Sequence, residues 1–260
     1  MYINDLNPVA FYIFEFEVRW YSLAYIFGLI FAFQYGKYII KKNNFFSFKK
    51  EILEDFLPYA ILGIIIGGRL GYIIFYDLYY YLNNPIKIFY VWQGGMSFHG
   101  GLIGVISITY YFIKNKNIEL FEFTDLLAII TPIGLFLGRI ANYINSELIG
   151  TPSNLPWSVI FIKIDNIPRH PSQIYEAFLE GLLLFLIINL IFKYKKIKGY
   201  VSALFLILYG FFRIIAEQFR LPDKHLGYIF DFISMGTILS LVMIIIGLMI
   251  LIYANYRKQN

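Results

Sequence analysis

Three arginines lie within stretches of sequence that are otherwise almost wholly apolar: Arg69, Arg139 and Arg213. Arginine keeps its charge in proteins, and its planar guanidinium group binds phosphate through two parallel hydrogen bonds. An arginine in the middle of a membrane raises the free energy of insertion by about 2.5–3.5 kcal/mol. For each arginine alone, the alternative is a position near a helix end from which the side chain extends to the lipid headgroups. The three together favour a polar site for an anion within a membrane.

The segment around Arg213 has the clearest pattern. Tyr209, Arg213, Glu217 and Arg220 follow one another at intervals of four, four and three residues, which places them on one face of a helix. Arg213 and Glu217 alone would form a local ion pair, but Arg220 leaves the stripe with a net positive charge. We therefore predict that this face contributes a surplus of guanidinium groups to an anion site.

A second polar group follows Gly138. Arg139 and Asn142 share a face if the helix continues that far, and Asn145 and Glu147 add an amide and a carboxylate. Glu147 would accept hydrogen bonds or brace Arg139. The alternative is that these residues only solvate a helix end at the membrane surface.

His99 lies between two pairs of glycines, at 94–95 and 100–101. Glycine allows a ligand or a second helix to approach the backbone closely. The unperturbed pKa of histidine, about 6.5, makes it a candidate general base. A structural role for this single histidine is the equally open alternative.

The composition defines the setting of these residues. Of 260 residues, 59% are hydrophobic and only 15% charged, against about 25% charged in soluble domains, and the mean hydropathy is +0.63. The net charge of +5 is carried by short lysine clusters between apolar runs, which favours membrane anchors over a nucleic-acid partner. The chain has no cysteine and its three histidines offer no ligand pair, so we expect no disulfide, no enzyme thiol and no metal.

Hydropathy predicts an all-α integral membrane protein, a single polytopic domain over 1–260 with seven spans of about 20 residues. The loops after the first, third and fifth spans, with the C-terminal tail, carry thirteen basic residues, and the opposite side carries six. The positive-inside rule therefore puts the N-terminus outside and the C-terminus in the cytoplasm. The predicted spans are 20–40, 54–76, 96–113, 124–142, 172–192, 199–217 and 229–253.

Two segments between the spans face outwards in this topology. Residues 77–95 are predicted to form an interfacial arm, and 143–171, with four prolines, a small irregular extracytoplasmic head. The same topology places Arg69, Arg139 and Arg213 in the outer halves of their spans. The sequence thus predicts a shared polar cavity that opens towards the outer leaflet.

Five blocks, in this order along the chain, resemble the prolipoprotein diacylglyceryl transferases, and the segment Gly138–Gly150 alone is a strong signature of that family. The resemblance extends from Arg19 to about Asp231, nearly the whole chain. The loops and the apolar residues between the blocks are particular to this sequence. The blocks are Gly68–Tyr72, Trp92–Gly101, Gly138–Gly150, His170–Glu176 and Tyr209–Asp223.

The resemblance implies an enzyme of the bacterial inner (plasma) membrane with no cofactor. It would transfer the diacylglyceryl group of phosphatidylglycerol to the thiol of the lipobox cysteine in the signal peptide of a preprolipoprotein, and glycerol phosphate would leave. The implied catalytic residues are His99, Arg139, Arg213, Tyr21 and Tyr209. The implied headgroup-binding residues are Arg139, Arg213, Asn142, Asn145, Glu147, Glu217 and Tyr76, and the supporting residues are Arg69, Gly150 and Arg220.

Two matters stay open at this point. The thiol needs a base or a positive field, and His99, Tyr21, Tyr209 or the charge of Arg139 would each serve. The alternative function is a transporter or binding protein for an anionic lipid or solute, which convergent arginines also fit. Against transport, the buried charges do not reach the cytoplasmic half of the predicted spans, so no polar path crosses the membrane.

Overall fold

The structure is a computed structural model that describes residues 2–91, 94–222, 228–229 and 233–259, and it is mostly helical. The chain forms two compact units. The first comprises Met1–Gly36 and Thr124–Asn260, and the second comprises Lys37–Phe123.

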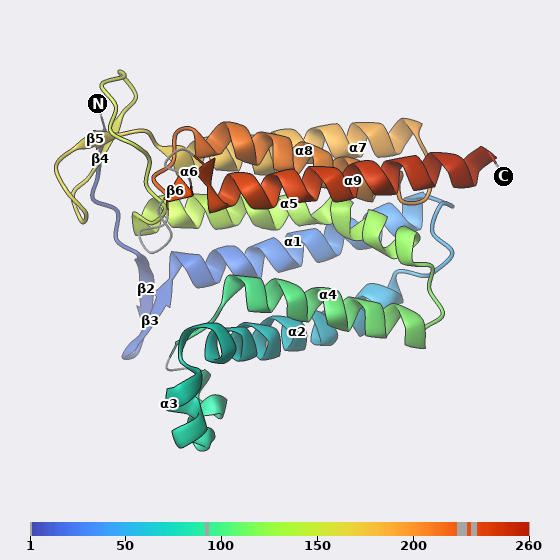
Figure 1. Cartoon of the computed structure of the whole chain (residues 1–260), viewed down its shortest axis with the longest axis horizontal. Helices are drawn as coiled ribbons and strands as arrows, with labels where there is room; N and C mark the ends of the chain where they lie inside the picture. Colours follow the sequence, from blue (N-terminus) through green and yellow to red (C-terminus); the bar gives the residue numbers. More distant parts are fainter. Residues whose placement is uncertain (1, 92–93, 223–227, 230–232, 260) are drawn as a thin grey trace. The chain divides into compact units, whose positions relative to one another are not determined.

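Long helices make up most of the first unit: α1 (Trp20–Lys42), whose last turns belong to the second unit, α5 (Leu120–Asn145), α8 (Tyr200–Glu217) and α9 (Met235–Gln259). Between α5 and α8 lies a helix in three parts, α6 (Ser172–Glu176), the π-helical η3 (Ala177–Leu183) and α7 (Leu184–Tyr194). Helix α8 packs along α9 (Figure 1). These helices begin and end within about six residues of the spans predicted from hydropathy.

A buried carboxylate fixes the start of α8 against α5. Asp125 accepts hydrogen bonds from the backbone N–H groups of Gly199 (2.8 Å) and Ser202 (2.7 Å), and from the Ser202 hydroxyl (2.6 Å). Gly199 adopts φ +83°, a conformation that favours glycine. This capping sets where α8 begins, and therefore where Tyr209 and Arg213 come to lie beside α5.

Short strands, which the sequence did not predict, complete the first unit. β1 (Tyr2–Asn4) pairs in parallel with β4 (Val159–Phe161), which pairs antiparallel with β5 (Pro168–Arg169). β2 (Val9–Ile13) and β3 (Phe16–Arg19) form a hairpin, and β6 (Tyr228–Ile229) pairs antiparallel with β7 (Ile233–Ser234). Buried Asn4 donates a hydrogen bond to the carbonyl oxygen of Tyr143 (2.8 Å), which ties the small sheet to the end of α5. Helix α5 itself continues to Asn145, so the non-helical head begins three residues later than predicted.

In the second unit, α2 (Glu51–Tyr76) packs along α4 (Phe98–Asn115), and the predicted arm between them contains α3 (Leu78–Asn83) and η1 (Pro85–Phe89) (Figure 1). Arg69 of α2 is 4% exposed and holds this arm. Its guanidinium group lies over the Tyr81 ring, 5.0 Å from the centroid. It donates hydrogen bonds of 2.5–3.3 Å to the carbonyl oxygens of Lys87, Ile88, Tyr90, Gly94 and Gly95. Arg69 thus ties the residues after α3 to helix α2.

Glycines allow α2 and α4 to touch along their backbones. A Cβ atom on Gly104 would lie 2.1 Å from the carbonyl oxygen of Gly63, and one on Gly67 would lie 2.4 Å from that of Gly100. Real Cβ atoms do not come so close to backbone oxygens. The helix pair therefore depends on small residues at four-residue intervals, as is common in membrane proteins.

We expect Gly104→Ala to destabilise the second unit by roughly 1–3 kcal/mol or more, because the added methyl group must push two backbones apart. Gly101→Ala is the matched control on the same helix, since its Cβ would lie 3.7 Å from its nearest neighbour, an ordinary contact. Thermal unfolding in detergent measures the difference. Equal unfolding temperatures for the two variants would contradict the close approach of α2 and α4.

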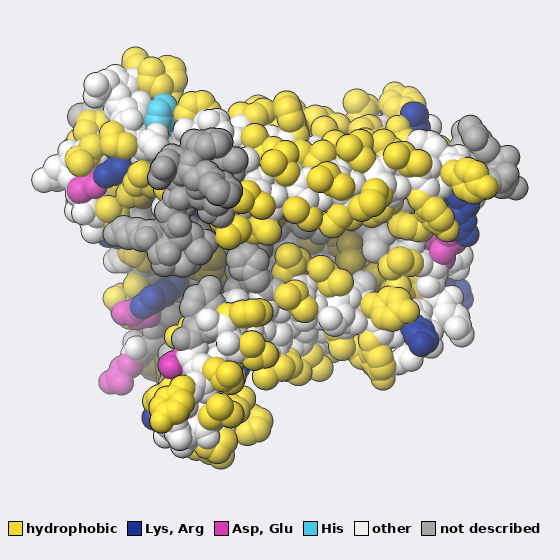
Figure 2. Space-filling model, viewed as in Figure 1, with side chains coloured by type: hydrophobic (Ala, Val, Ile, Leu, Met, Phe, Trp, Pro, Cys, Tyr) yellow, Lys and Arg dark blue, Asp and Glu magenta, His cyan; other side chains and the backbone are white. Residues whose placement is uncertain are grey.

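Within the residues that the structure describes, six helices are long and apolar enough to cross a membrane, so the protein is a multi-pass membrane protein. On the face visible in Figure 2, hydrophobic side chains cover α8 and α9, and basic side chains gather where α9 ends. Apolar residues of α9 such as Ile252 (70% exposed) suit contact with lipid. The six are Trp20–Lys42, Glu51–Phe75, Leu120–Asn145, Ser172–Tyr194, Tyr200–Glu217 and Met235–Arg257. The remaining predicted span, 96–113, coincides with α4.

Candidate active site

Three helical segments of the first unit bring six charged side chains together in its interior. Helix α5 contributes Arg139, the bent helix α6–η3 contributes Glu176 and Glu180, and the end of α8 contributes Arg213 and Glu217; Arg220 follows α8. The side chains of Glu176 and Glu180 are fully buried (0% exposed), and those of the arginines and of Glu217 are between 7% and 16% exposed. We call this group the Arg–Glu cluster.

The two central arginines share both buried carboxylates. Arg139 Nη1 lies 2.8 Å from Glu176 Oε2, and Arg139 Nη2 lies 3.0 Å from Glu180 Oε2. Arg213 Nη1 lies 3.2 Å from Glu176 Oε2 and 3.3 Å from Glu180 Oε1. Glu176 and Glu180 therefore bridge Arg139 and Arg213, and hold the two guanidinium groups beside each other.

The rest of the cluster extends along α8 and just beyond it. Arg213 Nη2 lies 2.8 Å from Glu217 Oε2, the helical pair expected from the sequence. Arg220 Nη1 lies 3.5 Å from Glu176 Oε1. The stripe predicted on this helix is thus present, but the positive surplus predicted for the site is not: in the whole cluster, three arginines face three glutamates. The prediction was wrong on this point because it counted the charges of one helix, whereas Glu176 and Glu180 come from another.

Glu180 is the residue of the cluster that was not predicted from the sequence, and Glu176 entered only as the last residue of the block His170–Glu176. The signal was available, because two acidic residues four positions apart interrupt the apolar run 172–192. Acidic side chains within a membrane span are rare and normally pair with basic ones. The arginines in neighbouring spans were the natural partners.

A close approach of α5 and η3 explains how Glu180 reaches Arg139. A Cβ atom on Gly181 would lie 2.6–3.0 Å from the backbone and Cβ of Phe136, so only glycine allows these helices to pack so tightly. The π-helical turn of η3 is a distortion that recurs at functional sites. The neighbouring residue, Glu180, is thereby placed beside Arg139, one turn after Phe136.

The chain leaving α5 is folded around Glu147. Asn142 Nδ2 donates to Glu147 Oε2 (2.9 Å), and Asn145 Nδ2 donates to Glu147 Oε1 (3.2 Å). Ser146 and Leu148 adopt positive φ values of 59° and 53°, which turn the chain back on itself. Of the two roles expected for Glu147, the structure therefore shows the acceptor of hydrogen bonds, from the two asparagines.

Gly150 lies at a crossing of three chain segments. It forms a β-bridge with Arg220, and a Cβ atom would lie 2.2 Å from the His170 carbonyl oxygen and 2.7 Å from that of Phe219. The segment after α5 can therefore lie between the end of α8 and the start of α6 only with glycine at this position. Gly150 thus allows the segment that carries Arg220 to lie close to the segment that leads into α6 and Glu176.

The predicted tyrosines differ in what the structure shows of them. The Tyr209 ring stacks on Phe205 (5.9 Å between centroids), and its hydroxyl interacts electrostatically with Glu180 and Arg139. The Tyr21 hydroxyl lies 3.4 Å from that of Tyr25. The side chains of Tyr76 and His99 lie outside the described part of the structure.

The Arg–Glu cluster is suited to an anion rather than to a metal ion, because its carboxylates already face guanidinium groups. Arg139 donates one hydrogen bond to Glu180 and forms an ion pair with Glu176, its guanidinium group has five N–H donors, and its side chain is 16% exposed. Donors therefore remain at a partly dry, preformed site, where hydrogen bonds to phosphate are strong. The fold and this cluster define a class: multi-pass membrane proteins with a buried cluster of arginines and glutamates.

Comparison with known proteins identifies the family. The family model described as prolipoprotein diacylglyceryl transferase matches residues 8–253. A phosphatidylglycerol–prolipoprotein diacylglyceryl transferase of Rickettsia bellii is 48% identical over 261 residues, covering 99% of both chains. One of Rhodospirillum rubrum is 43% identical over 257 residues, covering 97% of this chain and 94% of the relative. This chain belongs to the prolipoprotein diacylglyceryl transferase family, as its sequence blocks predicted.

Proposed function

We propose that this protein transfers the diacylglyceryl group of phosphatidylglycerol to the thiol of the lipobox cysteine in a preprolipoprotein. Family membership and the names of the relatives support the reaction. The observation that carries the proposal is the bridged pair of Arg139 and Arg213, whose contacts with Glu176 and Glu180 hold two guanidinium groups ready for one phosphate.

In the proposed reaction, the cysteine sulfur attacks the glycerol carbon that carries the phosphate oxygen. A C–S bond forms, the C–O bond breaks, and glycerol phosphate leaves with the bonding electrons. Arg139 and Arg213 stabilise the charge that develops on the departing phosphate. The cluster is neutral without substrate, because its three arginines face three glutamates, and it therefore needs no counterion when empty. For the same reason we expect the product phosphate to be held weakly and to leave. Asn142, Asn145 and Glu147 are proposed to contact the glycerol headgroup through their hydrogen-bonding groups.

The thiol must lose its proton before or during attack. His99 is the proposed base, and Tyr21, Tyr209 or the field of Arg139 are the alternatives. If His99 takes the proton, His99→Gln should lower the transfer rate by about 10²–10⁴-fold. The loss should shrink as the pH rises towards the thiol pKa of about 8.5, because more thiolate then forms unaided. A loss that is equal at every pH would assign His99 a structural role instead.

We propose that α4 is the seventh membrane span, and that the N-terminus lies outside and the C-terminus in the cytoplasm of a bacterial inner membrane. The support is the distribution of basic residues, thirteen on one side and six on the other. In this topology residues 143–171 are an extracytoplasmic head, and residues 77–95 are an arm at the membrane interface. The arm fits that role because its side chains include Tyr79 and Phe89, which are 82% and 71% exposed.

Single cysteines test the orientation, since the chain has none of its own. Both Asn154 and Lys196 are exposed positions, in the head and in the loop after α7. In intact cells, an impermeant thiol reagent should label Asn154→Cys and spare Lys196→Cys until the membrane is broken. Labelling of Lys196→Cys alone would reverse the topology.

Reconstituted transfer tests the proposed function itself. Liposomes that contain phosphatidylglycerol, the purified protein and a lipobox peptide should yield a peptide with one added diacylglyceryl group on its cysteine, measured by mass spectrometry. A peptide with serine in place of that cysteine is the control and should stay unmodified. Movement of lipid or solute across the bilayer with no modified peptide would support the transporter alternative.

A further inference from the structure

A hollow with a basic rim lies between the end of α1 and the start of α2, wholly within the second unit. It is lined by residues 40–51 and has a volume of about 360 Å³, within the range of ligand sites in proteins. Three lysines and one glutamate line it, Lys41, Lys49, Lys50 and Glu51, which leaves it net positive. This hollow is separate from the Arg–Glu cluster, which belongs to the first unit.

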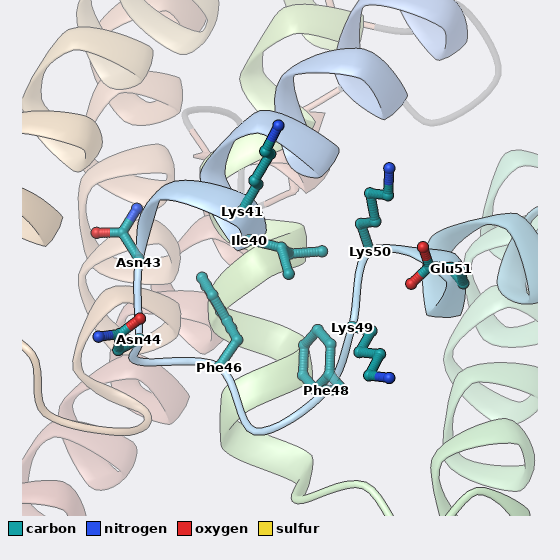
Figure 3. A pocket seen from close by; sticks show the side chains of 9 residues that line it. All are labelled: Ile40, Lys41, Asn43, Asn44, Phe46, Phe48, Lys49, Lys50 and Glu51. Carbon is teal, nitrogen blue, oxygen red and sulfur yellow. The ribbon is translucent and has the colours of Figure 1, made fainter.

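Figure 3 shows how the lining side chains lie. Lys41 and Lys50 extend in the same direction on either side of Ile40, and the rings of Phe46 and Phe48 lie below Ile40 in this view. Two ammonium groups therefore stand over an apolar floor. A ligand that fits both must carry a negative charge and an apolar or neutral part directly beneath it.

The lysines of the rim are available for such a ligand. Among the described residues, Lys41 and Lys50 have no acidic partner, whereas Lys37 pairs with Glu54 (2.5 Å) and Lys116 with Asp55 (2.6 Å). The other lysine-rich loop differs too, because Lys193 and Lys195 lie over the rings of Tyr194 and Tyr200. In the described part of the chain, no acidic side chain therefore neutralises Lys41 or Lys50.

The loop that carries the rim is firmly held. The backbone N–H and the hydroxyl of Ser47 both donate to Glu122 Oε2, at 3.0 and 2.6 Å, and Glu122 is itself 1% exposed. Phe46 is 8% exposed and packs against Phe48, with 5.4 Å between ring centroids. These contacts fix the loop between Lys41 and Lys50, so the backbone that carries both lysines does not have to be ordered when a ligand binds.

The position of the hollow identifies the kind of ligand. It lies where one apolar helix, Trp20–Lys42, ends and the next, Glu51–Phe75, begins, and both are long enough to span a membrane. Side chains at such ends lie at the level of the lipid headgroups. We propose that this hollow binds an anionic phospholipid, with its phosphate between Lys41 and Lys50 and its glycerol region over Phe46. The site is independent of the transfer reaction.

Thermal unfolding of the purified protein in neutral detergent tests the proposal. Short-chain phosphatidylserine is the probe, because it is anionic and lacks the glycerol headgroup of the proposed substrate, and short-chain phosphatidylcholine is the uncharged comparison. Phosphatidylserine should raise the unfolding temperature saturably, and phosphatidylcholine should not. The double variant Lys41→Gln/Lys50→Gln should raise the Kd for phosphatidylserine about 25-fold, since each basic residue at an anionic lipid surface changes Kd by a factor of about five.

Lys193→Gln/Lys195→Gln removes the same charge from the other lysine-rich loop and should leave the Kd unchanged. All these lysines are exposed, so the variants should unfold at the parent's temperature without lipid. An equal Kd for the two double variants would show that Lys41 and Lys50 do not form the lipid site, and would overturn the proposal. If inorganic phosphate stabilised the protein at the same concentrations as phosphatidylserine, the ligand of the hollow would be a free phosphate ion and not a lipid.

Discussion

Replacing Arg139 or Arg213 by lysine should lower the rate of diacylglyceryl transfer by about 10²–10³-fold, the usual effect of removing one hydrogen-bond donor to a developing oxyanion. Lysine keeps the charge but loses the planar group. Arg139 contacts Glu176 and Glu180 through different nitrogens. A single ammonium group cannot hold both carboxylates and still offer aligned donors to phosphate. Initial rates of lipobox-peptide modification in phosphatidylglycerol liposomes provide the measurement.

Arg169→Lys is the matched control for these variants. Arg169 is also buried (7% exposed), but it lies in the head and pairs with Asp165 at 2.5 Å, outside the Arg–Glu cluster. It should keep most of the parent's rate. If Arg139→Lys and Arg213→Lys are as active as Arg169→Lys, the two arginines do not hold the phosphate through paired hydrogen bonds.

Glu180→Gln should lower the free energy of unfolding by about 3–5 kcal/mol, the usual effect of removing one partner from a buried ion pair. The variant keeps the shape of the side chain but leaves Arg139 and Arg213 with an uncompensated charge in a fully buried place. That loss is comparable with much of the net stability of an ordinary domain, 5–15 kcal/mol. Unfolding in detergent, followed by circular dichroism, measures it.

Glu54→Gln removes a shorter ion pair, 2.5 Å with Lys37, from a side chain that is 50% exposed. Its effect should stay below about 1 kcal/mol, because exposed pairs contribute little. Similar losses in Glu180→Gln and Glu54→Gln would show that Glu180 is solvated in the membrane-embedded protein, and that the Arg–Glu cluster is not a dry site.

The helices were predictable because long apolar runs leave few alternatives. The run 20–40 became Trp20–Lys42, and 172–192 became the helix Ser172–Tyr194, even though its middle is π-helical. The strands were not predictable, because segments of two to five residues such as Tyr2–Asn4 are too short to show alternation. The pairing of β1 with β4 also joins residues more than 150 positions apart, which no local pattern indicates.

The candidate site was predicted in part. Spacing on one helix gave the pair Arg213 and Glu217, and the structure shows it at 2.8 Å. The charge balance was not predicted, because the charges of Glu176 and Glu180 in the neighbouring span were not counted with those of the arginines, although their spacing of four residues marks one face of that helix. The contact of Gly181 with Phe136, which brings Glu180 to Arg139, is a property of two packed helices and not of either sequence segment.

A structure of the protein with phosphatidylglycerol bound is the most direct measurement of the central claim. The phosphate of the lipid headgroup should lie within hydrogen-bond distance of the guanidinium groups of both Arg139 and Arg213, with the glycerol carbon to be attacked open to a thiol. A headgroup phosphate bound elsewhere, with Arg139 and Arg213 still occupied only by Glu176 and Glu180, would contradict the account.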